Sequence, residues 1–264
     1  MKKAKVIIFL ILTLSPPVMA QDGGNKRNIK IGIEFGANEY WGETVSSDRI
    51  RGNNSVSYSD RYYYDDYYGL YKSSQKMNVS YVGAKSEIFF LRNRLGIAAG
   101  LRVSKYSAAM RINNDYVLWV LDRNDLVTDY VKIRNLEQNS YYLGVPLELR
   151  FFPNRRELPF QLYFKIGAVL NCRVATVNQV DFVNNAMERY EDEVDRQMAN
   201  PSTFSAYIYP AIGFKISRYP WINMEVHLGN VMLQTYSFVE TDAGLGFQFS
   251  VQIPLGKNYP MGSK

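Results

Sequence analysis

The residues of this chain best suited to acid–base chemistry are its single histidine, His227, and Glu225. Because alternate residues of a β-strand lie on one face, a strand here would hold both side chains together. An imidazole beside a carboxylate can serve as a general base, but nucleophilic catalysis also needs a nucleophile in contact with the imidazole. No serine flanks His227. We therefore interpret the pair as part of a hydrogen-bonded interior, with a hydrolytic enzyme as the alternative.

Other residues that could carry chemistry give weaker signals. Asp65 and Asp66 could contact calcium, but the residues around them do not have EF-hand spacing. Cys172 is the single cysteine, which excludes an internal disulfide and a cysteine-rich metal site. We interpret it as a small apolar side chain on the apolar face of a strand. The sequence therefore predicts no catalytic residue, no cofactor and no metal.

Charged residues recur at alternate positions of several strand-like segments, on the face opposite the apolar residues. Charges in a narrow protein interior are retained when they are paired and hydrogen-bonded. We therefore predict an interior network of ion pairs, with a proton or ion path as the alternative. The predicted network consists of Lys85, Glu87, Arg102, Glu148, Arg150, Lys165, Lys215, Glu225 and His227. Further charges on the same faces are Lys30, Glu34 and Arg173.

The segments that carry these charges alternate apolar and polar residues with the period of two that is typical of a β-strand between two media. In residues 28–36, for example, Ile29, Ile31, Ile33 and Phe35 alternate with polar residues or glycine. Strands of about 9–11 residues suffice to cross the hydrocarbon core of a bilayer when tilted. The other predicted strands are residues 77–90, 95–106, 141–152, 160–174, 204–217, 222–231 and 243–255.

Two details of the strands follow from the same pattern. The apolar set of residues 77–90 shifts after Tyr81 from odd to even positions, which predicts a β-bulge near that residue. When the short connections are taken as hairpin centres, Arg102 falls opposite Gly83, and Glu148 falls opposite Lys165. Four further large polar residues also fall opposite glycine or alanine: Lys85, Glu87, Glu225 and His227. A large side chain opposite glycine suits the interior of an eight-stranded barrel, which is only just wide enough for its side chains.

Long and short connections alternate along the chain, and the strand count is even. In a bacterial barrel this places both termini on the side of the short turns, in the periplasm. The sequence therefore predicts an all-β fold: an eight-stranded antiparallel up-and-down transmembrane β-barrel with long extracellular loops and short periplasmic turns. A soluble barrel with the apolar face inside is the alternative. The long connections are residues 41–75, 107–140 and 175–203, and the short ones are 92–93, 153–159 and 218–220.

The N-terminus has the features of an export signal. Lys2, Lys3 and Lys5 precede an apolar run, and Ala20 ends a stretch suited to cleavage. We therefore predict a signal peptide in residues 1–20, an outer-membrane barrel in 21–255 and a periplasmic tail in 256–264. Removal of three lysines leaves 28 basic and 25 acidic residues, a balance of +3 that is too small to indicate a nucleic-acid partner.

The long connections hold two candidate contact surfaces. Residues 184–198 have apolar side chains at helical spacing among acidic ones, which predicts a short amphipathic helix that caps the barrel, or a docking site for a basic partner. Tyrosine-rich loops make good contact surfaces. The first connection therefore predicts a surface that binds protein or glycan, or an interfacial girdle, formed by Tyr62, Tyr63, Tyr64, Tyr67, Tyr68 and Tyr71.

Two adjacent predicted strands carry a family signal. YLGVPLELRFF in residues 142–152 and FKIGA in 164–168 match a "YLxxPLxLRY"-like strand followed by a "KxGxxxxY"-like strand. This pattern resembles the PorT-like outer-membrane β-barrel family of Bacteroidetes. The local motifs cover about thirty residues, and the layout covers essentially the whole mature chain. The resemblance implies an eight-stranded outer-membrane barrel, in a family whose named member is associated with protein secretion.

These patterns together predict a monomeric, non-enzymatic protein of the outer membrane, exported with its signal peptide. Its predicted partners are outer-membrane lipid and other envelope or secretion proteins, with a structural or interaction role carried by the outer loops. Two alternatives remain at this stage: an outer-membrane enzyme acting on lipid A or peptides, and a soluble ligand-binding barrel in the periplasm.

Overall fold

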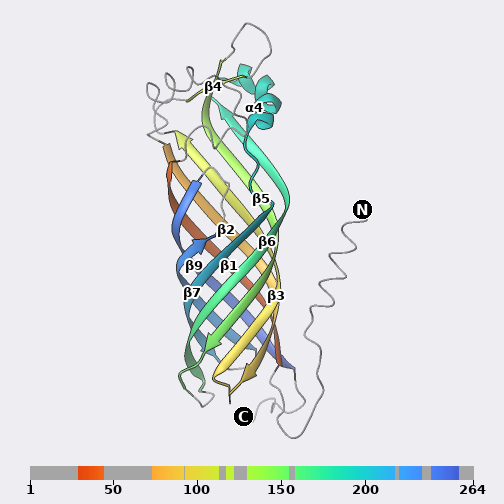
Figure 1. The fold of residues 1–264 in the computed structure, drawn as a ribbon, viewed down its shortest axis with the longest axis vertical. Helices are drawn as coiled ribbons and strands as arrows, with labels where there is room; N and C mark the ends of the chain where they lie inside the picture. Colours follow the sequence, from red (N-terminus) through yellow and green to blue (C-terminus); the bar gives the residue numbers. More distant parts are fainter. Residues whose placement is uncertain are drawn as a thin grey trace, which may run out of the picture.

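The computed structural model describes residues 29–44, 73–91, 93–112, 117–121, 130–154, 158–217, 220–233 and 239–255. Strands dominate this part of the chain, and a short helical segment lies at one end (Figure 1). The strands are β1 (Ile29–Thr44), β2 (Ser73–Phe90), β3 (Leu95–Ile112), β4 (Val117–Val120), β5 (Tyr130–Phe151), β6 (Phe160–Phe182), β7 (Phe204–Ile216), β8 (Trp221–Met232) and β9 (Val239–Leu255). The helical segment consists of the 3-10 helix η2 (Asn185–Tyr190) and the α-helix α4 (Glu191–Gln197).

Eight of the strands form a closed antiparallel ring. Their order is β3-β2-β1-β9-β8-β7-β6-β5, and pairing of β5 with β3 closes the ring. The short strand β4 pairs with the first residues of β5, beyond the part of β5 that pairs with β3. Closure gives each of the eight strands a partner on both sides, which a strand surrounded by lipid requires. The predicted eight-stranded antiparallel barrel is confirmed.

The two ends of the barrel differ. At one end, which we call the turn end, β1 begins, β9 ends and β2 turns sharply into β3 (Figure 1). Leu91 and Asn93 in that turn have positive φ values of 49° and 66°. At the other end, the loop end, β5 and β6 rise above the neighbouring strands and carry β4, η2 and α4 (Figure 1).

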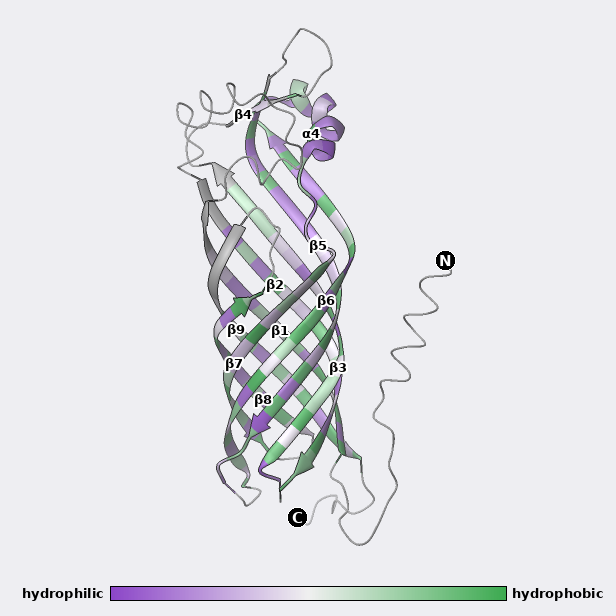
Figure 2. Ribbon diagram, viewed as in Figure 1, coloured by the Kyte–Doolittle hydropathy of each residue, from purple (hydrophilic) through white to green (hydrophobic). Residues whose placement is uncertain are grey.

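The outer face of the barrel is apolar over most of its height. On β1, the side chains of Ile31 and Ile33 are 48% and 53% exposed, whereas Lys30 and Glu34 are 1% and 0% exposed. The same alternation colours the walls of the barrel in Figure 2. Exposed apolar side chains around a buried charged interior are the arrangement of a membrane barrel, because lipid replaces water outside. This arrangement excludes the soluble barrel with an apolar interior.

Aromatic side chains lie toward the upper edge of this apolar band. Trp41 on β1, Tyr141 on β5 and Phe204 on β7 are all exposed on the outer face. Each lies nearer the loop end of the barrel than the exposed aliphatic residues Ile31 and Ile33 on β1, Leu147 and Leu149 on β5, and Ile208 and Ile212 on β7. Transmembrane barrels carry girdles of aromatic residues at the membrane interfaces. We therefore place the upper membrane interface at the height of these three residues.

Several strands are longer than the sequence pattern predicted. β5 and β6 contain 22 and 23 residues and extend through much of the expected loops 107–140 and 175–203. The upper part of β5 is largely polar, and the upper part of β6 mixes polar and apolar residues (Figure 2). Above the apolar band, an outward side chain meets water rather than lipid, so the alternation used to find the strands is lost there although the strand pairing continues.

The predicted β-bulge near Tyr81 is wrong. The pairing of β2 with β1 and with β3 runs through Tyr81 without a shift in register. Met77, Val79 and Tyr81 are 2%, 1% and 5% exposed, so they point into the barrel together with Lys85. The apolar set of the sequence changes parity because the interior itself changes from charged to apolar toward the loop end, and the strand stays regular.

Most of the predicted cross-strand pairs are confirmed. Arg102 pairs with Gly83, and Lys85, Glu87, Glu225 and His227 pair with glycine or alanine as expected. One predicted pair is wrong: Glu148 pairs with Gly167, and Lys165 pairs with Arg150. Phe151 pairs with Phe164, so the β5–β6 hairpin is centred between residues 157 and 158, one residue later than a Glu148–Lys165 pair would require.

Glycines in the barrel wall make room for tyrosine rings. Four of the buried tyrosines are each paired across two strands with a glycine, and a Cβ atom on that glycine would overlap the ring. The lumen is therefore packed by matching large residues with glycine, as the sequence pattern indicated. The four pairs are Gly36–Tyr81, Gly244–Tyr40, Gly167–Tyr209 and Gly213–Tyr163.

Some sequence predictions concern residues outside the described ranges. These are the signal peptide in residues 1–20, the tail in 256–264, the Asp65–Asp66 pair and the six loop tyrosines between positions 62 and 71. The described part of the chain contains no helix that is both long enough and apolar enough to cross a membrane.

Candidate functional site: the interior charge network

The interior of the turn-end half contains a network of ion pairs centred on Glu148. Lys85, on β2, reaches two carboxylates: its Nζ lies 2.9 Å from Glu34 Oε2 and 2.9 Å from Glu148 Oε2. Lys165 Nζ lies 3.2 Å from the other oxygen of Glu148, and Arg150 Nη2 lies 3.1 Å from Glu148 Oε2. One carboxylate on β5 thus joins cations that come from three strands.

A second carboxylate, Glu225 on β8, continues the network across the lumen. Arg150 Nη2 lies 2.7 Å from Glu225 Oε1, and Lys165 forms an ion pair with Glu225 Oε2. Arg150 Nη1 also contacts Glu87 Oε2 at 3.2 Å. Although Lys165 is not directly opposite Glu148, it contacts that residue diagonally across the β5–β6 pair.

Arg102 connects this network to the middle of the barrel. Its Nη2 lies 2.7 Å from Glu34 Oε1, and its Nη1 donates a 2.7 Å hydrogen bond to the Tyr207 hydroxyl. The guanidinium carbon lies 3.9 Å from the centre of the Tyr81 ring. Gln248 donates to Glu34 Oε2 at 3.1 Å and accepts from the Tyr81 hydroxyl at 2.9 Å. Polar neighbours therefore satisfy groups that the ion pairs leave free.

Tyrosine hydroxyls complete the hydrogen bonding of the two central carboxylates. Tyr163 donates to Glu225 Oε1 at 2.6 Å, and Tyr209 donates to Glu148 Oε1 at 2.8 Å. Both tyrosines are fully buried. Ionised groups can be held away from water only when such bonds replace their hydration, so the whole set forms one interdependent unit.

The charges of this unit balance. It contains four carboxylates and four cations, which are all at most 3% exposed. A neutral set of paired charges packed across an eight-stranded lumen fills the space through which a hydrated ion would have to pass. The members are Glu34, Glu87, Glu148 and Glu225 with Lys85, Arg102, Arg150 and Lys165.

His227 lies at the upper edge of the network. Its Nε2 is 3.8 Å from Glu225 Oε2, and its Nδ1 shares a 3.1 Å hydrogen bond with Asn38 Oδ1. The ring also packs against Tyr209 at a tilt of 33°, with 4.4 Å between ring centres. Both nitrogens therefore face groups of the barrel wall. Since a nucleophile must contact the base for catalysis, this environment matches a packed interior rather than a hydrolytic site.

Lys215 belongs to a different group, at the turn end. Its Nζ lies 3.7 Å from the centre of the Trp221 ring and 3.5 Å from Gln161 Oε1. Lys30 lies over the same Trp221 ring at 3.2 Å and over Phe89 at 3.6 Å. Cations over aromatic faces are stabilised by the ring quadrupole. The turn end of the lumen is thus filled by two lysines and aromatic rings.

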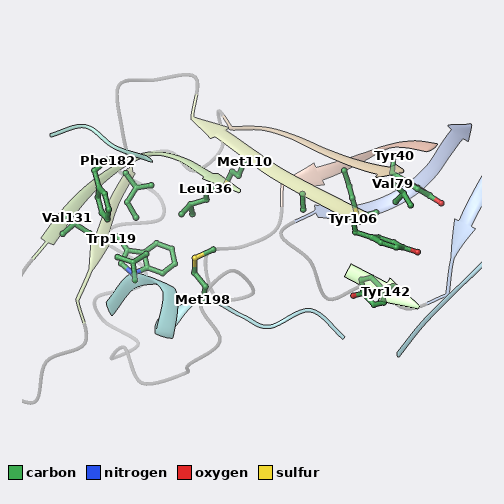
Figure 3. Close-up of a cluster of buried hydrophobic side chains, with 14 of the residues drawn as sticks. Tyr40, Val79, Tyr106, Met110, Trp119, Val131, Leu136, Tyr142, Phe182 and Met198 are labelled. Atoms are coloured by element: carbon green, nitrogen blue, oxygen red, sulfur yellow. The ribbon is translucent and has the colours of Figure 1, made fainter. Parts of the chain in front are cut away.

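Toward the loop end, the interior becomes an apolar core (Figure 3). Val194 and Met198 at the end of the helical segment are 0% and 3% exposed and pack into this core. Trp119 Nε1 on β4 donates a 2.8 Å hydrogen bond to Gln197 Oε1 on α4. The structure places the predicted amphipathic helix over this core. Its other members include Tyr40, Met77, Val79, Tyr106, Met110, Leu121, Val131, Ile133, Leu136, Tyr142 and Phe182.

The sequence missed part of the network and placed one residue on the wrong face. Glu34 had been recognised as an inward charge but was left out of the predicted site, although it binds both Lys85 and Arg102. Tyr81 was assigned to the outer face, and its even spacing from Gly83 and Lys85 was the signal that could have placed it inside. Arg173 is only half-buried and contacts Thr176 Oγ1 at 3.5 Å.

Within the described ranges, no three His, Cys, Asp or Glu side chains are grouped so that they could hold a metal ion. The carboxylates of the network instead receive cations and hydroxyl donors from the protein itself. The arrangement neutralises charge and fills space.

Comparison with known proteins gives distant likenesses among solved structures. No protein-family model and no curated protein matches the chain. Among solved structures, the crystal structure of the outer membrane protein OprG from Pseudomonas aeruginosa is similar, with 12% sequence identity and a TM-score of 0.41 over 87% of this chain and 98% of that chain. The class of the protein follows from its own geometry: a closed ring of antiparallel strands with an apolar outer face and paired charges inside is a transmembrane β-barrel.

Proposed function

We propose that this protein is an integral outer-membrane β-barrel that catalyses no reaction and acts through its loop end, by contact with other envelope or secretion proteins. The observation that carries the proposal is the neutral, ion-paired interior of the turn-end half. It occupies the lumen that a pore would need. The surface that remains for a partner in water is the loop end, where β4, η2 and α4 rise above the apolar band (Figure 1).

The proposed parts of the chain are a signal peptide (1–20), the barrel (21–255) and a periplasmic tail (256–264). Tyr62, Tyr63, Tyr64, Tyr67, Tyr68 and Tyr71 would add contact surface to the loop end. The chain would be a monomer in outer-membrane lipid and would not bind nucleic acid. The PorT-like motifs at 142–152 and 164–168 support Bacteroidetes as its source and an accessory role in protein secretion, although no family model matches.

The second candidate function is an outer-membrane enzyme acting on lipid A or peptides. It would use His227, whose contacts with Asn38 and Glu225 resemble part of a base–orienter arrangement. However, His227 is fully buried beneath Tyr40 and the apolar core. Mass spectrometry of lipid A from cells with His227→Phe tests this function. A change in lipid A would support the enzyme, and unchanged lipid A would support the proposal.

A crosslinking experiment tests the proposed contact at the loop end. A photoreactive residue is placed at Asp192, which is exposed on α4, and as a matched control at Leu147, which is exposed on the outer face of β5. We expect the Asp192 probe to capture a discrete envelope protein in whole cells and the Leu147 probe to label lipid. Heat-modifiability on an unheated gel confirms that both variants are folded. Folded protein at the surface without a discrete Asp192 product would contradict the proposal.

A further inference from the structure

A bulge in β8 turns one amide side chain into the middle of the barrel. The pairing of β8 shifts at Leu228–Asn230 on the side of β9, and the pairing with β7 shifts at the same height. Gly229 within the bulge has a φ of +65°, a conformation that L side chains rarely adopt. Leu228 and Gly229 are both exposed, and Asn230 is 0% exposed. Without the extra residue, the inward position would fall to Gly229. Bulges often serve to re-aim a side chain in this way.

The amide that the bulge turns inward lies among polar atoms without hydrogen-bond partners. Neither the oxygen nor the nitrogen of the Asn230 side chain makes a hydrogen bond in the protein. The Tyr40 hydroxyl faces the amides of Asn38 and Asn230, but it is not in hydrogen-bonding geometry with either. Asn38 Nδ2 is also without a partner. All three residues are at most 2% exposed.

The opposite wall carries the same kind of group. In the ring, β3 lies across from β8, and β6 lies across from β1. Ser104 Oγ on β3 and Asn171 Oδ1 on β6 are buried without hydrogen-bond partners. The Asn171 amide nitrogen donates to the Tyr106 hydroxyl at 3.0 Å, and Tyr106 lies near Tyr40. Uncharged donors and acceptors from four strands thus point into the lumen from opposite walls, and we call them together the middle layer.

This layer lies between the ion-paired network and the apolar core, where single polar atoms such as Glu87 Oε1 and Asn135 Oδ1 also lack hydrogen-bond partners. Below it, the ion pairs and tyrosine hydroxyls bind one another, and above it the core is apolar. Buried polar groups in native proteins almost always have a partner, in the protein or in ordered water. Neutral amides and hydroxyls offer no net charge for an ion, but they match water, which both donates and accepts. A water molecule needs about two to four such partners.

We propose that the middle of the barrel is a site for internal water, bound by Asn230, Tyr40 and Asn38 on one wall and by Ser104 and Asn171 on the other. The bulge at Gly229 completes the site, because it turns the Asn230 amide inward and this amide has no other hydrogen-bond partner. The site is independent of the proposed contact at the loop end. The proposed water makes the middle layer a hydrated region, in contrast to the paired charges below it and the apolar core above it.

Water contacts of side-chain amides test this proposal. The protein, labelled with ¹⁵N and folded in deuterated detergent micelles, is studied by water-selective NOE and ROE spectroscopy. We expect the Asn230 amide to show a water cross-peak with the sign of a long-lived contact. Loss of that signal in Asn230→Leu assigns it. Gln138 is the matched control, because its buried amide nitrogen already donates to Asn178 Oδ1 at 3.0 Å and to the Ala199 carbonyl at 2.9 Å.

Two outcomes would overturn the proposal. Absence of the cross-peak at Asn230 in folded protein would mean that the layer is dry. Equal cross-peaks at Asn230 and Gln138 would mean that bulk water reaches buried amides generally. Tyr40→Phe gives a further check: it should weaken the Asn230 cross-peak by about twofold, because the water loses one of about three partners. An unchanged cross-peak in Tyr40→Phe would contradict the assignment of Tyr40 to the site.

Discussion

The two halves of the barrel interior are filled by opposite kinds of side chain, although the same strands build both. Along β2, Lys85 and Glu87 lie in the turn-end half, and Met77 and Val79 point inward in the loop-end half. The half with charges inside is the half with the apolar outer face, so lipid surrounds its paired charges. The half with the apolar core rises into the polar region above the band (Figure 2).

This difference shows how a narrow barrel can be stabilised in two media. In lipid, the hydrophobic effect does not draw apolar residues inward, so the interior is held by directional bonds and by packing. Above the membrane, where water surrounds the wall, burying apolar residues inside again releases free energy. The charged half should therefore respond mainly to changes of charge, and the apolar half to changes of volume and local contacts.

The largest expected effect is a reversal of charge at Glu148. Glu148→Lys would bring a fifth cation against Lys85, Lys165, Arg150 and Arg102. Removing one partner of a buried pair alone costs about 3–5 kcal/mol, so we expect the folded fraction in vesicles to fall sharply. Heat-modifiability measures that fraction.

The exchange variant with both Glu148→Lys and Lys165→Glu tests whether Glu148 and Lys165 form an isolated ion pair or belong to a larger network. If Glu148 and Lys165 formed an isolated pair, the exchange would restore folding. In the structure, the lysine introduced at position 148 would still face Lys85, Arg150 and Arg102, so we expect little recovery. Recovery to near the wild-type yield would mean that the network is a set of separate pairs.

A second prediction places a charge on the outer face of the same strand. It tests whether charged side chains are tolerated only inside the barrel. Leu147 is 48% exposed toward lipid and follows the inward Pro146 on β5. Leu147→Arg should cost about 2–4 kcal/mol near the bilayer midplane. The cost should depend on bilayer thickness in unfolding measurements with vesicles of different lipids. Gln248→Arg, which faces the lumen, is the control; thickness dependence of the control alone would invert the assignment of inside and outside.

These predictions depend on features that the sequence revealed to different degrees. The alternation of apolar and polar residues located all eight strands, because one face of each strand lies against an apolar medium and the other against a polar one. It also placed Arg102 opposite Gly83. It could not show where the interior changes from charged to apolar, because an inward valine such as Val79 looks the same as a lipid-facing one. The false bulge at Tyr81 arose from this ambiguity.

The sequence pattern also could not predict which side chains contact each other across the lumen. Alternation assigns Glu34, Lys85 and Glu225 to one face, but it does not say which of them meet, since partners come from strands far apart in the chain. Glu148 is an example: its contacts with Lys85 and Arg102 depend on the curvature of the closed ring. The position of Asn230 required the bulge at Gly229, which no local pattern indicated.

A smaller effect is expected from a methyl group in the wall of the charged half. Gly213 pairs with Tyr163, and a Cβ atom there would overlap the ring that donates to Glu225. Gly213→Ala should therefore cost about 1–3 kcal/mol, as overpacking in a core usually does. Urea unfolding of the protein in vesicles measures the change. Gly213→Ala should cost less when it is added to Tyr163→Leu than when it is added to the wild type, because the ring that it overlaps is then absent; an equal cost would assign the effect to the backbone.

The smallest effect is expected in the apolar half, where the Trp119 indole is one of the groups that hydrogen-bond α4 to the wall. Trp119→Phe removes the 2.8 Å bond from the indole to Gln197. A hydrogen bond of this kind contributes about 0.5–1.5 kcal/mol. Because the barrel below is held by its own ion pairs, we expect this loss to appear as local opening of α4 rather than as unfolding. Trypsin should cut faster at Arg196, which is exposed on α4, while heat-modifiability stays unchanged.

Trp41→Phe, which changes an indole on the lipid face, should leave that cleavage rate unaltered. If Trp119→Phe instead reduced heat-modifiability as strongly as Glu148→Lys, the two halves would unfold as one unit, and their different interiors would not reflect separate sources of stability.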